Sequence, residues 1–293
     1  TQHTTPICKG GYVKIKTGDV ERNIQLNRIH MEEDAGKSMH DQHDLFSVVD
    51  YNRAGVPLIE IVSEPDLHSG DEAAAYVTEI RKLVRTLNVC DGNMEEGSLR
   101  CDANISIRLK GETKLGTKVE IKNLNSFRFV ESAIDFEVQR QIAVLENNGI
   151  INQETRLYDS DTNKTRVMRS KEEANDYRYF PDPDLLPLEV TAADKARVQA
   201  TMPELPEAMK VRFEADFGLS AYDANALSSS RDMADYFVAT VNAGAEAKPA
   251  ANWILGAISA KLNAEEKTML QSPISARLLA MLLRPRQRMM QQI

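Results

Sequence analysis

The chain has 293 residues, of which 42% are hydrophobic and 27% are charged, a composition typical of a soluble globular protein rather than a disordered one. No apolar run reaches the roughly 18–20 residues that span a membrane, and the first residues lack the pattern of a signal peptide. The three cysteines include no CxxC pair, which argues against a disulfide framework and a thiolate zinc site. We therefore expect a protein of the reducing cytoplasm, with no membrane partner.

The formal net charge of −8 is distributed unevenly along the chain. From Glu189 onward there are 12 basic and 12 acidic residues, so the whole acidic excess lies before that point. An acidic segment does not coat nucleic acid, since binding a polyanion relies on Lys and Arg, but it suits a site for a divalent cation. Any RNA contact must therefore be local. One candidate is a basic cluster, for which the ordinary alternative is a solvated helix face: Arg277, Arg284, Arg286 and Arg288.

The first predicted element is a β-hairpin over residues 11–33. Hydrophobic and polar residues alternate on both sides of a turn at residues 17–19. Residues 56–62 form a second β-rich apolar run, in which Pro57 restricts the run to the start of a strand or to a sheet edge.

Two helices are predicted further along the chain. The first covers residues 70–88, where apolar residues recur at helical spacing and Ser69 and Glu72 form a capping box. The second runs from about residue 127 to residue 147, behind Ser126 as its N-cap.

Two alternating runs lie between these helices, at residues 98–108 and 118–122, and predict strands with one polar face each. Each face mixes Arg or Lys with Asp, Glu or Asn. A cleft that holds phosphates, a cation and a carboxylate substrate would need that mixture, whereas the ordinary alternative is a face turned to bulk solvent. The polar positions are Ser98, Arg100, Asp102, Asn104, Ser106 and Arg108 in the first run, and Lys118, Glu120 and Lys122 in the second.

The second part of the chain is predicted to be helical. Residues 180–184 contain two prolines and stop any regular element. Beyond them the strand pattern disappears, and short helical segments begin near residues 206, 220, 231, 250 and 273. We therefore predict an α+β domain over residues 1–188 and an all-helical domain over residues 189–293, with Trp253 in the core of the latter.

Common nucleotide-binding and hydrolase motifs are absent. Residues 35–38 resemble the end of a Walker A loop, but Met31 stands where that motif needs its first glycine. Neither GxGxxG nor GxSxG occurs. A zinc role for His40 and His43 has little support, because no further ligand follows nearby. If the protein handles ATP, it does so on a different scaffold.

The strongest local feature is a run of three acidic residues, Glu32, Glu33 and Asp34. Their mutual repulsion is costly unless a cation lies among them, and carboxylate oxygens suit Mg²⁺. Taken alone, the run is better explained by an acidic surface turn. Glu60 adds to the case for a cation, because it lies inside an apolar strand where an ionised carboxylate needs a partner or a metal. Its ordinary alternative is an outward-facing position on a half-exposed strand.

Five long runs together resemble the B-subunit family of the aspartyl/glutamyl-tRNA amidotransferases. They match that family's motifs in order, densely in the α+β part and more loosely in the helical part. The runs are RIHMEEDAGK at 28–37, VDYNRAGVPLIEIV at 49–62, MEEGSLRCDAN at 94–104, EIKNLNS at 120–126 and DYRYFP at 176–181.

The resemblance implies a fold and a reaction. The expected fold is a glutamine-synthetase-like cradle domain built on an antiparallel sheet, followed by an all-α domain. The expected enzyme is a carbon–nitrogen ligase with glutamine as amido-N-donor. ATP, with Mg²⁺, phosphorylates the side-chain carboxylate of Glu-tRNA(Gln) or Asp-tRNA(Asn), and ammonia then displaces the phosphate. The ammonia comes from a partner amidase (the A-subunit), and a small C-subunit is the third member of a cytoplasmic heterotrimer.

The resemblance also suggests site residues. Glu33 and Glu60 match the family's Mg²⁺-ligating carboxylates, with His30 and Glu32 beside them. The polar faces described above supply the remaining assignments as hypotheses. They are Lys37, Arg100, Asn104 and Lys122 for ATP, and Glu96, Asp102 and Glu120 for catalysis or a second cation.

Two departures from the family pattern are expected to matter. The family's N-terminal segment, with a metal-binding histidine, and its C-terminal tail domain are both missing, so we expect a fragment with an incomplete metal site and weak tRNA affinity. The loop at residues 41–46 is slightly longer than usual. Two alternatives stay open: a scaffold that presents tRNA to the amidase partner without chemistry, and a stand-alone ligase that acts on a free amino acid.

Overall fold

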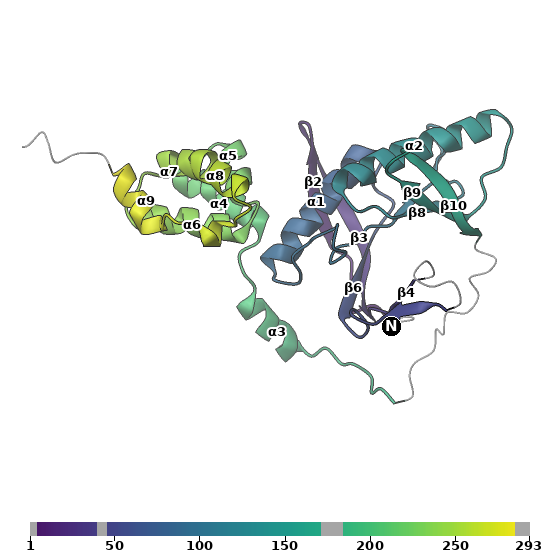
Figure 1. Cartoon of the computed structure of the whole chain (residues 1–293), viewed down its shortest axis with the longest axis horizontal. Helices are drawn as coiled ribbons and strands as arrows, with labels where there is room; N and C mark the ends of the chain where they lie inside the picture. The colour runs from purple at the N-terminus through teal and green to yellow at the C-terminus, as the bar shows by residue number, and fades with distance from the viewer. Residues whose placement is uncertain (1–4, 40–45, 171–183, 285–293) are drawn as a thin grey trace, which may run out of the picture. The chain divides into compact units, whose positions relative to one another are not determined.

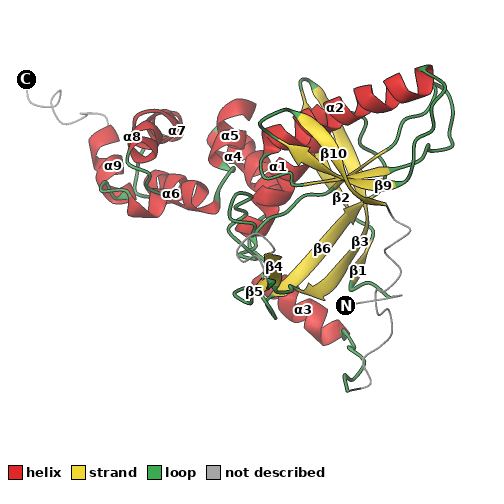
Figure 2. Ribbon diagram, turned by 45° about the vertical axis from the view of Figure 1, so that its right-hand side comes forward, coloured by secondary structure: helices red, strands yellow, loops and turns green. Residues whose placement is uncertain are grey.

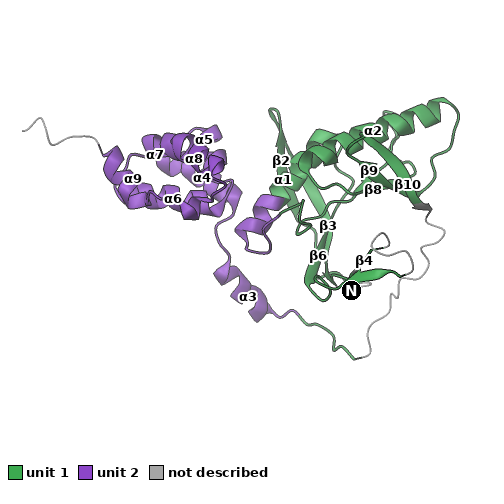
Figure 3. Ribbon diagram, viewed as in Figure 1, with its two compact units in different colours: residues 1–80, 93–189 green, residues 81–92, 190–293 purple. Residues whose placement is uncertain are grey.

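The computed structural model describes residues 5–39, 46–170 and 184–284 (Figure 1). Its contacts divide the chain into two compact units, coloured separately in Figure 3. Unit 1 comprises Thr1–Ile80 and Asn93–Glu189, and unit 2 comprises Arg81–Gly92 and Val190–Ile293. The predicted assignment of a catalytic domain to residues 1–188 and a helical domain to 189–293 stays a prediction. The motif at 176–181 and the loop at 41–45 lie outside the described residues.

The first sheet of unit 1 is built around one long strand, β3 (Val20–Glu33). Its first half pairs antiparallel with β2 (Tyr12–Thr17), which confirms the predicted hairpin. Its second half pairs antiparallel with β6 (Pro57–Ser63) and with the short β1 (Cys8–Lys9). Pro57 is the first residue of β6, where its missing N–H is tolerated. Val13, Ile15 and Ile24 of the hairpin are buried, as the alternation predicts, and Leu26 is half-buried.

The second sheet has the order β10-β9-β8-β7. Its strands are β7 (Ala103–Ile105), β8 (Val119–Lys122), β9 (Glu154–Asp159) and β10 (Lys164–Ser170). Neighbours are antiparallel except β8 and β9, which run parallel. A parallel pair requires a crossover, and α2 (Phe127–Glu146) supplies it. Figure 2 shows two strands of this sheet, β9 and β10, beside α2. A separate pair, β4 (Lys37–Met39) and β5 (Val48–Asp50), is antiparallel.

The predicted strand over residues 98–108 is too long. Only Ala103–Ile105 pair with a neighbour. Farther before them, the chain makes a turn in which the Asn93 Oδ1 accepts the N–H groups of Glu95 and Glu96. The predicted alternation nevertheless holds, since Cys101 points inward and burial raises the pKa of its thiol to about 12. The even-numbered polar residues from 98 to 104 are exposed.

Two helices complete unit 1, although the part of the first helix after Ile80 is assigned to unit 2. In α1 (Gly70–Thr86), the Ser69 Oγ accepts the Glu72 N–H at 3.2 Å, whereas the Glu72 carboxylate accepts the N–H of His68 rather than that of Ser69. The predicted capping box is therefore half formed. In α2, the Ser126 side chain accepts the Phe129 N–H, as predicted for an N-cap.

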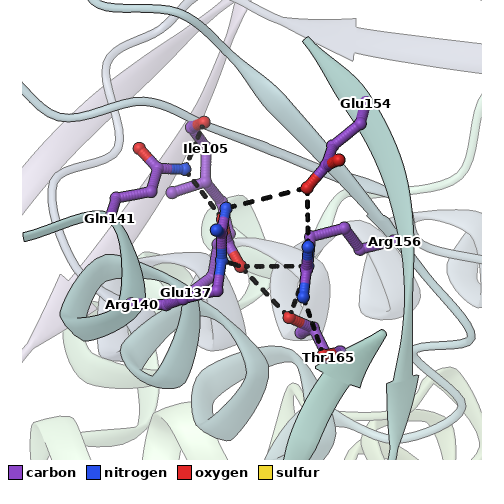
Figure 4. Close-up of polar contacts among 7 residues, drawn as sticks. All are labelled: Ile105, Glu137, Arg140, Gln141, Glu154, Arg156 and Thr165. Atoms are coloured by element: carbon purple, nitrogen blue, oxygen red, sulfur yellow. Dashed lines mark hydrogen bonds and ion pairs between the residues drawn. The ribbon is translucent and has the colours of Figure 1, made fainter. Parts of the chain in front are cut away.

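A fully buried carboxylate on α2 holds that helix against the second sheet (Figure 4). The Glu137 Oε1 accepts from the Arg140 Nη2 at 2.6 Å and from the Gln141 Nε2 at 3.0 Å. Its Oε2 accepts from the Thr165 Oγ1 at 3.2 Å and lies 3.7 Å from the Arg156 Nε. Arg156 and Thr165 belong to β9 and β10, so one carboxylate joins a helix and two strands.

Unit 2 contains no strand among its described residues. Its helices are α3 (Ala192–Thr201), α4 (Pro206–Phe217), α5 (Ala221–Leu227), α6 (Arg231–Asn242), α7 (Ala247–Trp253), a π-helix (Ile254–Ile258), α8 (Ser259–Ala264), a 3₁₀ turn (Met269–Gln271) and α9 (Ala276–Leu283). Phe213 and Phe237 are fully buried in its core. The prediction for Trp253 is wrong, because this side chain is 51% exposed. Its neighbours Ala251 and Ile254 take the inward positions instead.

Candidate active site

Two neighbouring strands bring a histidine and two carboxylates together. His30 and Glu60 are register partners on β3 and β6, and Glu32 follows His30 by two positions, so the three share one face. The His30 Nδ1 lies 3.9 Å from the Glu60 Oε2, and one potential ligand atom from each residue lies within 4.8 Å of the others. The Glu60 side chain is 48% exposed. The group can therefore offer a cation one imidazole nitrogen and two carboxylate oxygens.

Glu33 lies apart from this group. It is the last residue of β3 and the register partner of Pro57, and successive strand residues point to opposite faces. The structure therefore brings Glu60 together with His30 and Glu32, and not with Glu33. Consecutive residues of one strand cannot all face the same ion, which the acidic run alone does not reveal. A metal-binding role for Glu33 stays a prediction.

The carboxylate that follows β3 connects two arginines. The Arg100 Nη2 donates to the Asp34 Oδ2 at 3.0 Å, and the Arg53 Nε lies 3.7 Å from the same oxygen. Arg53 also donates to the Gly97 carbonyl oxygen at 3.4 Å. These contacts hold the segment before β7 against the end of β3. Arg100, which we predicted to contact phosphate, keeps 48% of its side chain exposed.

A second basic residue is held between two carboxylates on the other sheet. Lys122 donates to the Asp102 Oδ2 in a short contact, and its Nζ lies 3.6 Å from the Glu120 Oε1. The Glu120 Oε2 accepts from the hydroxyl of the buried Thr155 at 2.7 Å. Burial lowers the pKa of Lys122, but hydrogen bonding to Asp102 and the charges of both carboxylates outweigh it, so the pKa is raised. Lys122 is therefore an ammonium at neutral pH, the form that binds phosphate.

The remaining predicted residues have looser surroundings. Asn104 lies on β7 opposite Glu120 and is exposed. Glu96 is exposed in the turn before β7, with its N–H held by Asn93. Lys37 begins β4, and its side chain lies outside the described part of the structure. These three residues are not brought into contact with the histidine–carboxylate group by any interaction that we observe among the described residues.

One segment connects the two sheets. Arg100 contacts the end of β3 through Asp34, and Asp102, two positions later, contacts Lys122 on β8. The polar face predicted for this segment therefore contacts the residue that follows β3 through Arg100 and contacts β8 through Asp102. A separate cavity of about 260 Å³ contains none of the predicted site residues. It is lined by Ile107, Gly116, Thr117, Gln141, Leu145, Gly149, Ile150 and Ile151.

Sequence reasoning missed three contributors. Asp34 was visible as part of the acidic run, but its role as the partner of two arginines depends on the fold. Arg53 lies inside a recognised motif without a pattern of its own. No sequence pattern indicated Thr155, because this residue contacts Glu120 only through the parallel pairing of β8 with β9.

Comparison with known proteins identifies the family of the chain. A family model described as the GatB/GatE catalytic domain matches residues 1–195. Relatives from Methylobacillus flagellatus and Thioalkalivibrio sulfidiphilus are 56% and 55% identical over 285 residues, and one from Azoarcus sp. is 55% identical over 286. Each is named as the B-subunit of aspartyl/glutamyl-tRNA(Asn/Gln) amidotransferase. The chain belongs to this B-subunit family. The matches cover 96–97% of the chain and 59–60% of the length of these relatives.

Family membership confirms the resemblance seen in the five sequence runs. The antiparallel sheets and helices of the structure agree with the α+β fold class. Among the residues that the structure describes, no helix has the length and apolar character needed to cross a membrane.

Proposed function

We propose that this chain carries the site at which ATP and Mg²⁺ activate the side-chain carboxylate of a glutamate or aspartate misattached to tRNA(Gln) or tRNA(Asn). It would thus be part of a carbon–nitrogen ligase that uses glutamine as amide donor. The observation that carries the proposal is a pair of cations held by one segment and its neighbours: Arg100 pairs with Asp34, which follows β3, and Asp102 pairs with Lys122 on β8. The histidine–carboxylate group lies on β3 and β6.

The proposed reaction has two steps. A carboxylate oxygen of the aminoacyl group attacks the γ-phosphorus of ATP, the bond to the bridging oxygen breaks, and an acyl phosphate and ADP form. Ammonia then attacks the acyl carbon, and phosphate leaves with the C–O bond electrons while the nitrogen loses a proton. Phosphoryl transfer needs positioning and charge stabilisation more than covalent work by the protein.

The described residues suit these needs. His30, Glu32 and Glu60 would hold Mg²⁺, which supplies neutralisation of phosphate charge when bound. Arg100 and Lys122 would contact phosphate oxygens, since both are charged, partly exposed and oriented by carboxylates. We keep Asp102, Asn104, Glu96 and Glu120 as proposed ligand-orienting or cation-binding residues, and Lys37 as a proposed ATP contact.

The proposal extends to fold family and partners. Unit 1 would be the glutamine-synthetase-like cradle, and the helical unit would follow it. Ammonia would come from glutamine hydrolysed by the partner amidase, the A-subunit, and the small C-subunit would be the third member of a cytoplasmic heterotrimer. The relatives' name, which includes both tRNA(Asn) and tRNA(Gln), supports an RNA-linked substrate.

The test uses the complete complex and three variants of this protein: Glu60→Ala, Lys122→Met and Glu33→Ala. Glutamine hydrolysis and ATP-dependent amidation of mischarged tRNA are followed separately. We expect Glu60→Ala and Lys122→Met to lower amidation and ATP cleavage by about 100-fold or more while glutamine hydrolysis persists. Asp235→Ala, in an exposed pair with Arg231, is the control that should change neither activity.

The same data separate the alternatives. Full amidation in both Glu60→Ala and Lys122→Met would contradict the proposed site and favour a tRNA-presenting scaffold. ATP cleavage with free glutamate and without tRNA would favour a stand-alone ligase. Loss of activity in Glu33→Ala would support the family-based metal ligand over the group formed by His30, Glu32 and Glu60.

A further inference from the structure

A basic loop, residues 106–118, connects β7 to β8 and is not used by the site described above. Four of its side chains are cationic and only one, Glu112, is acidic. Every residue from 108 to 118 is exposed. This is an unusual concentration of positive charge, because the whole acidic excess of the chain lies before Glu189. The cations are Arg108, Lys110, Lys114 and Lys118.

The positive charge of the basic loop is not compensated locally. Within the described part of the chain, we find no carboxylate oxygen within 4.0 Å of the side-chain nitrogens of these four residues. Arg108 donates instead to a neutral acceptor, the carbonyl oxygen of Thr113, at 2.8 Å. Arg100 and Lys122 differ in this respect, since each is paired with an aspartate. The loop therefore offers free cationic groups to a partner.

The base of the loop is closed by backbone contacts rather than left open. A Cβ on Gly116 would lie 2.2 Å from the carbonyl oxygen of Ile107, so only glycine allows the two ends to approach so closely. Gly111 has a φ of +96°, which also favours glycine. Together with the Arg108–Thr113 hydrogen bond, these features give the loop a defined form on its two strands.

The loop joins the two strands that carry predicted site residues. It begins two positions after Asn104 and ends two positions before Glu120, and these two residues are register partners on β7 and β8. An RNA whose aminoacyl end enters the site extends beyond it, and the basic loop continues these two strands. Cations spread over positions 108–118 suit phosphates repeated along a polynucleotide, and the loop contains no aromatic side chain for stacking on a base.

We propose that the basic loop binds backbone phosphates of the RNA whose aminoacyl group enters the candidate site. This inference rests on the proposed function, because it takes the RNA-linked substrate from there. It adds a contact surface that lies outside the set of residues assigned to ATP and the cation. The contacts are sequence-independent, since phosphates carry no base information.

The test compares Lys110→Ala/Lys114→Ala/Lys118→Ala with the wild-type protein in the complete complex. The Kd for uncharged tRNA is measured by filter binding at several salt concentrations, without turnover. We expect the Kd at 150 mM salt to rise by roughly tenfold or more, and the slope of log K against log salt to become shallower by about 1 for each lysine. The rate at saturating RNA and the KM for ATP should stay unchanged. The matched control removes three exposed lysines elsewhere in unit 1: Lys9, Lys16 and Lys164.

Four results would overturn the inference. The first is an unchanged Kd and salt slope, and the second is an equal loss of affinity in the control variant. The third is a raised KM for ATP, which would assign the loop to the free nucleotide. The fourth is loss of the partner proteins on purification, which would assign the loop to a protein surface. A different result would contradict the proposed function. A wild-type complex that binds RNA normally but never cleaves ATP would contradict the proposed function alone, and not the role of the basic loop.

Discussion

At the scale of single residues, Thr155 shows how a neutral side chain orders charged ones. It is fully buried on β9, and its hydroxyl donates to Glu120, which in turn lies beside Lys122. A carboxylate that accepts such a bond has fewer orientations open to it. The hydroxyl therefore fixes which Glu120 oxygen faces the ammonium group of Lys122.

We predict that Thr155→Val destabilises the protein by about 1.5–3 kcal/mol, because Val keeps the shape but removes the hydroxyl that donates to the partly buried Glu120 carboxylate. Thr155→Ser retains the hydroxyl and should recover most of that loss, apart from the missing methyl group. Urea unfolding of all three proteins measures the difference. Equal stability of the Val variant and the wild type would show that the hydrogen bond contributes nothing.

Residue types in the sequence predicted much of the site's chemistry but not its grouping. The alternation predicted a polar face for each of the two runs, and Asp102 from the first run does contact Lys122 from the second. Glu33 and Trp253 show the limit. Which of several adjacent acidic residues face one another depends on strand register, and which side of a short helix is buried depends on its neighbours.

At the scale of elements, α2 is attached to its sheet by charge as well as by apolar packing. Glu137 has no exposed surface and contacts groups from α2, β9 and β10. Burying a carboxylate is costly unless it is paired and hydrogen-bonded, and here both conditions are met. Such an arrangement makes the helix position specific, since a shift along its axis would leave buried charges unpaired.

We predict that Glu137→Leu costs about 3–5 kcal/mol, because it leaves Arg140 and Arg156 without their shared buried counter-charge. Native-state hydrogen exchange of amides in residues 127–146 should accelerate accordingly. The control is Asp235→Leu, which removes one partner of an exposed pair and should change stability by less than about 1 kcal/mol. If both variants exchange at the same rate in α2, the buried network does not hold the helix.

Elements with a strong local pattern were predictable, and elements defined by distant partners were not. The hairpin, β6, α1 and α2 follow from periodicity, turn residues and caps that lie within each segment. The strands β9 and β10 were not predicted, nor was the parallel pairing of β8 with β9. Their residues alternate too weakly to indicate strands. The direction in which two strands pair depends on both of them, so no single segment predicts it.

At the scale of the whole molecule, the division into two units has a consequence for proteolysis. The described residues after 183 and before α3 form no helix or strand, and Leu188 is 67% exposed there. Leu282 is also 67% exposed but lies within α9. Proteases bind their substrates as extended chains, so exposure alone is not sufficient for cleavage.

We predict that limited chymotrypsin digestion cleaves at Leu185 or Leu188 well before it cleaves at Leu282, whereas Leu186 is protected by the proline that follows it. Mass spectrometry of the early fragments identifies the cuts. Two fragments that meet within residues 185–189 are the expected result. Early cleavage at Leu282 at a comparable rate would contradict the view that local backbone structure, and not exposure, governs this chain's sensitivity.

The parallel pairing of β8 with β9 also limits the order in which parts of the protein can fold. Antiparallel neighbours joined by a short turn can pair as soon as both are made, but β9 follows β8 only after the whole of α2. Pairings between distant segments form slowly, because closing the intervening chain costs entropy first. During synthesis Glu120 and Lys122 therefore emerge long before Thr155 does, and their surroundings are completed only once the crossover helix has folded back. The candidate active site is thus a late product of folding, although its strands are among the earlier ones to leave the ribosome.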